Sequence, residues 1–321
     1  MPERAAGLRA CVAAESGNIA GVVKFGALFL FALGVAGAAL PTTGARAAGE
    51  DQVTQSVWNG YQRLDFTVDG RPCLLVAPAQ VAPGRPWIWR TEFFDVEPQA
   101  DLALLAHGWH VAYMDVKNMY GAPRAIALMG HFYAHVTAFY DLAKRPVLEG
   151  FSRGGLYAFN FAWVHPSEVA ALYLDAPVLD IRSWPGNNRA SKEWADCLAA
   201  YDLTEQSVAS YRGGPLEHIA TVARAGIPIV AVCGDADQTV PFAENTAVLE
   251  KRYHELGGNI QVILKPGGDH HPHSLKDPAP IVDFLLKNAR FTASEPKVSL
   301  TTAATAEVVR HVIAPVVDRL P

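Results

Sequence analysis

Residues 147–155, Val-Leu-Glu-Gly-Phe-Ser-Arg-Gly-Gly, constrain the fold of this chain more than any other stretch. A short apolar run ends in the pattern Gly-x-Ser-x-Gly-Gly, and an amphipathic segment follows at residues 156–165. This order predicts a strand, a sharp turn with Ser152 at its tip, and a helix. Glycines on both sides of the serine leave room for neighbouring backbone and allow unusual dihedral angles. A plain strand-to-helix turn with Ser152 as an N-cap gives a similar local sequence, so the rest of the chain has to decide.

Strand and helix patterns alternate along most of the chain. The expected strands are residues 63–68, 71–76, 86–90, 110–116, 145–149, 169–175, 227–233 and 260–265. The expected helices are residues 101–107, 125–143, 156–165, 242–256 and 280–288. The first two strands read as a hairpin around Asp69-Gly70. The alternation predicts an α/β fold, with a mostly parallel twisted sheet and helices on both faces. In such sheets, sites form at the carboxyl ends of the strands.

Two segments interrupt this regularity. Residues 178–225 contain tryptophans and short helical pieces, and they are too long for an ordinary connection, which predicts a helical cap. Residues 291–321 are rich in Thr, Ala, Ser and Val, and we interpret them as a C-terminal tail with one amphipathic helix.

The N-terminus has the pattern of an export signal. Basic residues precede an apolar run at residues 25–40, and the sequence Ala-Arg-Ala follows at residues 45–47. These features predict a signal peptide over residues 1–47, with an uncleaved N-terminal anchor as the alternative. We therefore expect a periplasmic or secreted domain over residues 48–290, with no stable membrane insertion after cleavage.

Charge and cysteine content exclude several functions. The formal net charge is −5 and no Lys/Arg-rich run occurs, so a nucleic-acid partner is not expected. After the N-terminal segment three cysteines remain. An odd number does not make a disulfide framework, although one bridge is possible. Cys73 and Cys233 lie in apolar runs and are expected to be buried thiols.

Polar loops follow two later predicted strands. The sequence Gly-Asp-Ala-Asp occupies residues 234–237, and Gly-Gly-Asp-His-His occupies residues 267–271. A serine hydroxyl is a poor nucleophile until a base takes its proton, and that base is commonly a histidine oriented by a carboxylate. Along the chain, a serine, an aspartate and a histidine therefore occur in the order Ser, Asp, His, each after a predicted strand. This order distinguishes one triad architecture from the others.

On these residues the chain resembles the α/β-hydrolase superfamily. The closer likeness is to exported bacterial serine esterases and to the catalytic domains of prolyl peptidases. The phrases that carry it are residues 87–90, 150–155, 175–178, 183–186 and 270–275. The resemblance implies an α/β-hydrolase fold with a helical cap and a serine hydrolase activity that needs no cofactor.

The resemblance also implies a catalytic triad. Ser152 matches the nucleophile, and Asp237 matches the acid, with Asp175 and Asp235 as alternatives. His270 matches the base, with His271 and His273 as competitors.

A metal site is the rival interpretation of the three histidines, because imidazoles are common ligands. The cluster lacks a partner HExxH motif or cysteine pair, and a serine nucleophile needs no metal. No metal is therefore expected.

An oxyanion hole needs two N–H donors. The resemblance assigns one to the amide of Arg153, directly after the nucleophile, and the other to Arg90 or Thr91, after the strand at residues 86–90. The HGGG phrase of many lipases is absent there. The side chains of Arg153 and Arg90 are equally consistent with anion binding and with salt bridges.

Aromatic residues in predicted loops suggest a substrate class. Trp89, Trp184 and His271 are the candidate substrate-binding residues, and tryptophan faces suit a sugar or aryl group, although packing roles are as common. The preferred function is hydrolysis of a small-molecule or carbohydrate-linked ester. The alternatives are a peptidase acting on short peptides, whose relatives usually carry an N-terminal propeller, and a non-catalytic binding protein on the same fold.

Overall fold

The computed structural model of this protein describes residues 53–291. The predicted signal peptide and residues 292–321 of the predicted tail lie outside this range. Within residues 53–291, no helix is both long enough and apolar enough to span a bilayer.

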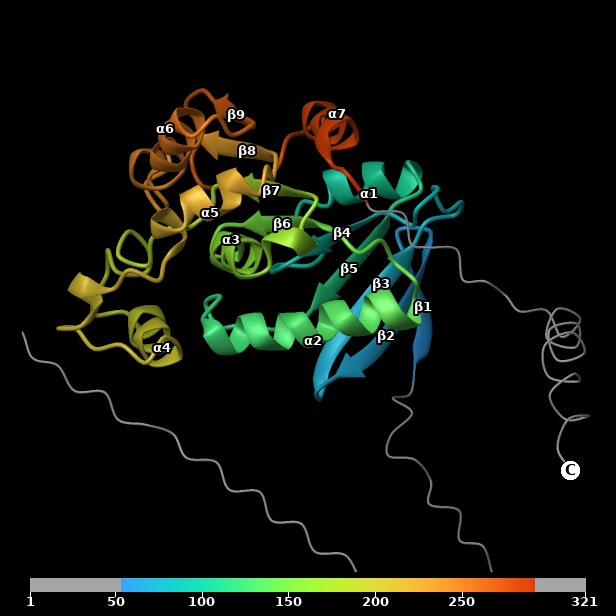
Figure 1. The fold of residues 1–321 in the computed structure, drawn as a ribbon, viewed down its shortest axis with the longest axis horizontal. Helices are drawn as coiled ribbons and strands as arrows, with labels where there is room; N and C mark the ends of the chain where they lie inside the picture. The colour runs from blue at the N-terminus through green and yellow to red at the C-terminus, as the bar shows by residue number, and fades with distance from the viewer. Residues whose placement is uncertain (1–52, 292–321) are drawn as a thin grey trace, which may run out of the picture. The chain divides into compact units, whose positions relative to one another are not determined.

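Within the described range, nine strands form one sheet in the order β1-β2-β3-β5-β4-β6-β7-β8-β9 (Figure 1). The pairs β1–β2, β2–β3 and β3–β5 are antiparallel, and the remaining pairs are parallel. The strands are β1 (Thr54–Trp58), β2 (Tyr61–Val68), β3 (Arg71–Ala77), β4 (Trp87–Arg90), β5 (His110–Met114), β6 (Val147–Phe151), β7 (Ala171–Asp175), β8 (Ile229–Gly234) and β9 (Ile260–Lys265). The predicted mostly parallel α/β sheet is confirmed.

Helices cover both faces of the sheet (Figure 1). One face packs against α1 (Gln99–Ala106) and α7 (Ala279–Asn288), which also contact each other. The other face packs against α2 (Pro123–Phe139), α3 (Gly154–Val164), α5 (Ile219–Arg224) and α6 (Thr246–Glu255). A short 3-10 turn, η1 (Pro166–Glu168), links α3 to β7.

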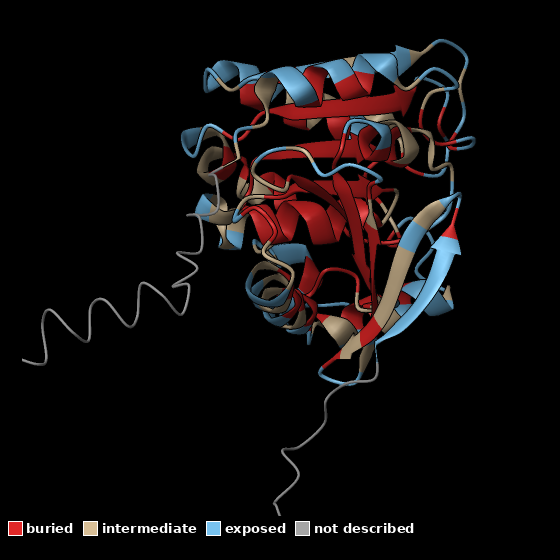
Figure 2. Cartoon of the chain, turned by 90° about the vertical axis from the view of Figure 1, so that its right-hand side faces the viewer, coloured by how far each residue is buried: buried red, intermediate tan, exposed pale blue. Residues whose placement is uncertain are grey.

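Alternation along the central strands divides the core in two. In β7, Leu172 and Leu174 belong to the core under α3, whereas Ala171 and Tyr173 belong to the core under α7. Successive side chains of a strand point to opposite faces, so a strand covered on both sides reads as a continuous apolar run. Figure 2 shows these central strands as the most buried part of the domain.

The long connection from β7 to β8 carries α4 (Lys192–Ala200), the 3-10 turns η2 (Val208–Ser210) and η3 (Pro215–Glu217), and then α5. Ser191 caps α4 by accepting a hydrogen bond from the amide of Trp194 at 3.0 Å. Trp194 is buried and belongs to the core on the α3 side.

Two elements differ from the sequence prediction. Strand β1 was not expected, because four of its five residues are exposed and show no apolar alternation. The helix expected over residues 242–256 is broken into η4 (Phe242–Glu244) and α6. Asn245 lies at the break, where its side chain accepts from the amide of Leu179 and donates to the Ser183 hydroxyl, at 2.8 and 2.9 Å. The break therefore ties the start of the β7–β8 connection to α6.

Candidate active site

The turn after β6 holds Ser152 in a strained backbone conformation, with φ at 49°. The Ser152 amide donates to the carbonyl of Asp175, and the Ser152 carbonyl accepts from the amide of Val178, both at 2.8 Å. A positive φ is unfavourable for a residue with a Cβ and persists only where the surroundings hold it. These contacts with the end of β7 supply that support.

Two glycines of the motif are required by close backbone approach. A Cβ at Gly150 would lie 2.8 Å from the carbonyl oxygen of Gly154, inside the turn. A Cβ at Gly155 would lie 2.6 Å from the Cβ of Pro177. The glycine pattern therefore lets the helix begin directly against the strand and the loop after β7.

Three side chains from separate loops meet at this turn. The Ser152 Oγ lies 2.9 Å from His270 Nε2, and His270 Nδ1 lies 2.7 Å from Asp237 Oδ2. Because the Asp237 carboxylate accepts the Nδ1–H, Nε2 is left as the acceptor for the serine hydroxyl. The structure thus brings together Ser152, Asp237 and His270, which follow β6, β8 and β9.

Asp237 is held in place by its own loop. Its Oδ1 accepts from the amides of Thr239 and Val240, each at 2.8 Å, which leaves Oδ2 for the histidine. Asp235, one alternative acid, instead accepts from the Gly267 amide at 2.6 Å and braces the two loops.

The acid loop and the histidine loop also touch through backbone. The Ala236 amide donates to the Gly268 carbonyl at 2.9 Å. A Cβ at Gly234 would lie 2.2 Å from the same carbonyl oxygen, so only glycine fits there. This contact fixes the separation of Asp237 and His270.

The environment of His270 favours its neutral form. The residue is 5% exposed, and burial lowers the pKa of the imidazole, against an opposing attraction from Asp237. A histidine has to be neutral to accept a proton, so this shift suits a general base near neutral pH.

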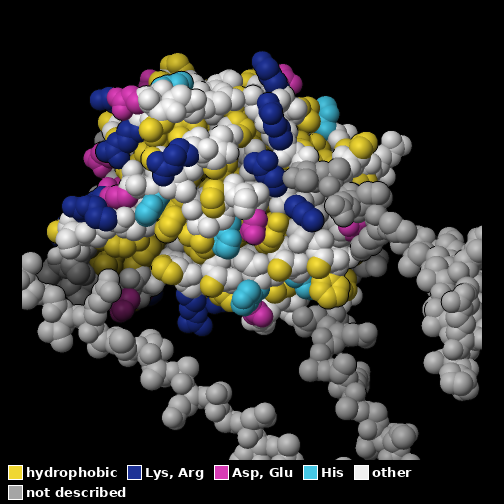
Figure 3. Space-filling model, viewed as in Figure 1, with side chains coloured by type: hydrophobic (Ala, Val, Ile, Leu, Met, Phe, Trp, Pro, Cys, Tyr) yellow, Lys and Arg dark blue, Asp and Glu magenta, His cyan; other side chains and the backbone are white. Residues whose placement is uncertain are grey.

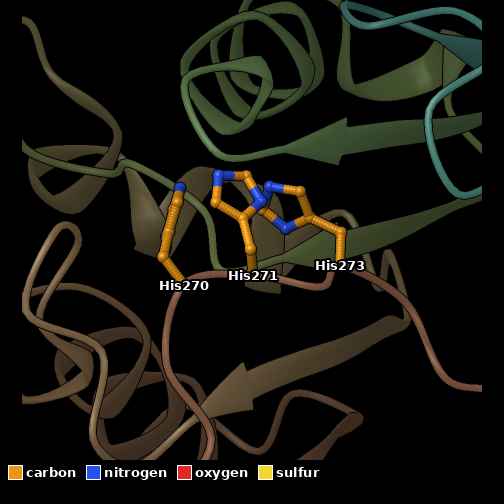
Figure 4. Close-up of side chains that lie close together, drawn as sticks. All are labelled: His270, His271 and His273. Carbon is orange, nitrogen blue, oxygen red and sulfur yellow. The ribbon is translucent and has the colours of Figure 1, made fainter.

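A second aspartate–histidine pair lies beside the first. Asp175 is fully buried; its Oδ1 accepts from His273 Nδ1 and its Oδ2 from the Ser274 amide, both at 2.8 Å. Asp175 therefore holds His273 and not His270. His271 is exposed between the two pairs, and Figure 4 shows the three imidazoles on the same side of one loop.

The expectation that Arg90 or Thr91 donates the second oxyanion hydrogen bond is not met. Arg90 lies within β4 and pairs with β5 on one side and β6 on the other. The Thr91 amide extends the sheet by donating to the Glu149 carbonyl at 3.0 Å. The first amides beyond the sheet belong to Glu92 and Phe93, and the Glu92 nitrogen lies 3.8 Å from the Cβ position of Gly154.

The Arg90 guanidinium is buried in salt bridges and is not free to bind an anionic substrate. It pairs with Glu149 at 2.9 Å and Asp101 at 3.0 Å, and it donates to the carbonyls of Phe93 and Val96. Burial raises the pKa of the Glu149 carboxyl well above its ordinary value, and the neighbouring Asp101 carboxyl raises it further, against the opposing effect of Arg90. Arg90 therefore fixes the loop after β4.

The Arg153 side chain pairs with the buried carboxylate of Glu92. Its guanidinium also lies over the rings of Phe93 and Tyr120, at 5.2 and 5.9 Å from their centroids. Trp184 is half-buried, and its ring centroid lies 6.2 Å from that of Tyr120. Tyr120 therefore lies between Trp184 and the Arg153 guanidinium.

Trp89 is a core residue, contrary to its expected role in substrate binding. It lies in β4, is 1% exposed, and packs against Trp87, Phe132 and Phe161. The strand is central in the sheet and covered on both faces, so its aromatic side chains have no access to a ligand.

A pocket of about 340 Å³ lies away from Ser152, between the start of α2, the second half of α3 and the β7–β8 connection. Its walls are mostly apolar and include Ile126, Trp163, Tyr201 and Tyr211. None of the residues hydrogen-bonded in the Ser152–His270–Asp237 chain lines it.

Several residues around the site were missed in the sequence. Glu92, Asp101 and Glu149 are buried acids; Asp175 and His273 were named only as alternatives for the triad, and their pairing with each other was not foreseen. Arg90 and Glu149 each stand in an otherwise apolar strand, and a charge in a buried strand requires a partner. That signal could have paired them before the structure was known.

The sheet, the helices on both faces and the serine turn after β6 together define an α/β-hydrolase fold. No protein-family model matches the chain. No curated protein matches it by sequence.

Solved structures show the same fold at low sequence identity. S-formylglutathione hydrolase from Agrobacterium tumefaciens has a TM-score of 0.54 at 15% identity, over 73% of this chain and 97% of that one. Est1E from Butyrivibrio proteoclasticus has a TM-score of 0.51 at 16% identity, over 70% and 98%. Acylaminoacyl peptidase from Pyrococcus horikoshii has a TM-score of 0.52 at 11% identity, over 75% and 42%, so the match spans about two fifths of that protein. The predicted fold is confirmed.

Proposed function

We propose that this protein is a serine hydrolase that cleaves a carboxylic ester through an acyl-enzyme. The observation that carries the proposal is the continuous hydrogen-bonded chain from Ser152 through His270 to Asp237, with the serine at a strained turn. The three groups have the relative positions that a nucleophile, a base and an orienting acid need.

In the acylation step, His270 Nε2 takes the Ser152 proton as Oγ attacks the ester carbonyl. Asp237 accepts the Nδ1–H, keeps the ring oriented and stabilises the imidazolium. The developing oxyanion is bound by the Arg153 amide and by an amide of the loop after β4, for which Glu92 or Phe93 is the candidate. The protonated His270 then gives its proton to the leaving alcohol.

In the deacylation step, water takes the place of the alcohol. His270 accepts a proton from that water as it attacks the acyl carbonyl, and the serine leaves with the proton returned. The cycle restores the free Ser152 hydroxyl and the neutral His270.

A small or carbohydrate-linked ester is the proposed substrate class. Trp184 and Phe93 are half-buried and lie on either side of the buried Tyr120 and the Arg153 guanidinium, and aromatic faces suit sugar rings and aryl groups. S-formylglutathione hydrolase and Est1E match this chain over nearly their whole length, which supports this choice.

A peptidase activity is the second candidate, because acylaminoacyl peptidase and a dipeptidyl peptidase 4 share the fold. The same triad serves both reactions, and the leaving group distinguishes them.

Export to the periplasm or the medium is proposed on the sequence of residues 1–47 alone. Expression in a bacterial host with N-terminal sequencing of the periplasmic fraction tests it. A mature N-terminus near residue 48 is expected, whereas an intact Met1 in a membrane fraction would refute it.

The decisive experiment compares the wild type with Ser152→Ala in two assays, covalent labelling by a fluorophosphonate and turnover of p-nitrophenyl acetate. We expect labelling and turnover in the wild type, and loss of labelling with a fall in kcat of about 10⁴-fold or more in the variant. Ser210→Ala is the matched control, since this serine is exposed in η2.

Absence of both labelling and turnover in a folded wild type would refute the hydrolase proposal. Labelling with hydrolysis of aminoacyl p-nitroanilides but not of esters would replace the esterase with the peptidase.

A further inference from the structure

Three imidazoles gather on the loop after β9. One ring nitrogen from each of His270, His271 and His273 can be chosen so that all three atoms lie within 4.8 Å of one another. Their ring centroids are 4.7–4.9 Å apart, and Figure 4 shows the rings on the same side of the loop.

Two of these rings are oriented by carboxylates. His270 Nδ1 lies 2.7 Å from Asp237, and His273 Nδ1 lies 2.8 Å from Asp175. Both bonds use Nδ1–H, so the lone pair of each ring is on Nε2, and that of His270 faces the Ser152 hydroxyl at 2.9 Å. An imidazole whose second nitrogen donates to a carboxylate is the common arrangement of a metal-ligating histidine, because the bond fixes the tautomer and raises ligand basicity.

The third ring is free to adjust. Zinc takes histidine nitrogens at about 2.0–2.1 Å, which puts tetrahedral ligand atoms about 3.3 Å apart. His270 and His273 are buried, but His271 is exposed, so rotation of its side chain can shorten the distances from its ring nitrogen to those of the other two histidines. Three imidazoles favour a borderline ion such as Zn²⁺ over Mg²⁺ or Ca²⁺, which prefer oxygen ligands.

We propose that His270, His271 and His273 form a Zn²⁺ site whose occupancy blocks the catalytic base. Zinc at His270 Nε2 uses the lone pair that accepts the Ser152 proton, so the bound ion competes with the serine hydroxyl for the same atom. The ion is an inhibitor and not a cofactor. Binding depends only on the three histidines, whereas inhibition rests on the proposed hydrolase function.

Binding is tested first, without reference to activity. Chelator-treated full-length protein is titrated with Zn²⁺ by calorimetry and with Co²⁺ by visible absorption, for the wild type, Ser152→Ala and His271→Ala. We expect one ion per chain and a tetrahedral Co²⁺ spectrum in the wild type and Ser152→Ala. His271→Ala should bind at least about 10-fold more weakly.

Surface histidines elsewhere are the main competing explanation, and Figure 3 shows several at the surface of the face in view. His254→Ala is therefore the matched control, because His254 is exposed on α6 and outside the cluster. Its affinity should equal that of the wild type. The site would be overturned if His271→Ala bound Zn²⁺ as tightly as the wild type does. It would also be overturned if His254→Ala lost as much Zn²⁺ affinity as His271→Ala.

Inhibition is tested next, on wild type and His271→Ala, each relative to its own metal-free rate. Fluorophosphonate labelling and ester turnover should fall with Zn²⁺ over the range in which calorimetry shows binding, recover on adding chelator, and require at least about 10-fold more Zn²⁺ in His271→Ala. Full activity at saturating Zn²⁺ would overturn the block of the base. If the wild type has no hydrolase activity but binds Zn²⁺ through His271, the function fails and the site stands.

Discussion

At the scale of single residues, the site depends on which aspartate reaches which histidine. Asp175 and Asp237 lie at or after the ends of adjacent strands, and each binds the Nδ1 of a different imidazole. Of the two pairs, the Asp237 pair continues to Ser152, the proposed nucleophile, through the 2.9 Å contact between His270 and Ser152. The Asp175 pair instead anchors the loop by also accepting from the Ser274 amide.

The two aspartates should therefore respond differently to replacement by asparagine. Asp237→Asn should lower kcat by about 10⁴-fold with little loss of stability, because the ring loses its tautomer and orientation. Asp175→Asn should lower the free energy of unfolding by about 1–3 kcal/mol, because it weakens bonds to buried donors. Ester kinetics and urea unfolding of both variants measure this. A larger kcat loss in Asp175→Asn than in Asp237→Asn would contradict the assignment.

At the scale of elements, the geometry of the candidate site depends on the distance between the loops after β8 and β9. The Gly234 Cα and the Gly268 carbonyl meet so closely that a side chain cannot be placed between them. The Asp237–His270 hydrogen bond spans these loops, so its length depends on that contact.

Gly234→Ala should separate the loops and lower kcat/KM by about 10-fold or more, since small displacements of catalytic groups are costly. The melting temperature should fall as well. Gly130→Ala is the matched control, because a Cβ there meets nothing within 4 Å and alanine favours a helix such as α2 by up to about 1 kcal/mol. Unchanged kinetics in Gly234→Ala would show that the loops adjust independently.

At the scale of the whole molecule, burial of ionisable groups sets acid stability. His110 begins β5 and is 2% exposed. Burial lowers the pKa of its imidazole to about 4, with a smaller contribution from Arg85. An unfolded histidine titrates near 6.5, so between those values the unfolded chain binds more protons, and stability falls as pH falls.

Protonation linked to His110 should lower the free energy of unfolding by about 2–3 kcal/mol as the pH falls from 7 to 4.5. His110→Gln removes the titrating group, so its unfolding free energy should depend less on pH over this range by that amount. Urea unfolding at both pH values measures it, with the exposed His254→Gln as control. Equal pH dependence in the wild type and His110→Gln would place the acid sensitivity elsewhere.

Sequence reasoning predicted the parts of this molecule that local pattern determines. The strand–turn–helix at Ser152, the alternation of elements and the order of the serine, aspartate and histidine loops follow from periodicity and turn residues, whereas the choice of Asp237 and His270 within those loops came from the resemblance to the α/β-hydrolase superfamily. The strand at Trp89 and Arg90 was predicted, but the complete burial of these two side chains was not, because β4 has only four residues and its burial comes from β5, β6 and the covering helices. The exposed residues of β1 carry no apolar signal at all.

The backbone of Ser152 has a consequence for how the protein should be handled. A positive φ costs a residue with a side chain on the order of 1–3 kcal/mol, and glycine avoids that cost. Ser152→Gly should therefore melt at a higher temperature than Ser152→Ala, and higher than the wild type if the lost hydrogen bond to His270 contributes less. A screen that ranks variants by melting temperature alone would then select Ser152→Gly, which lacks the proposed nucleophile. Such a screen therefore has to measure turnover as well.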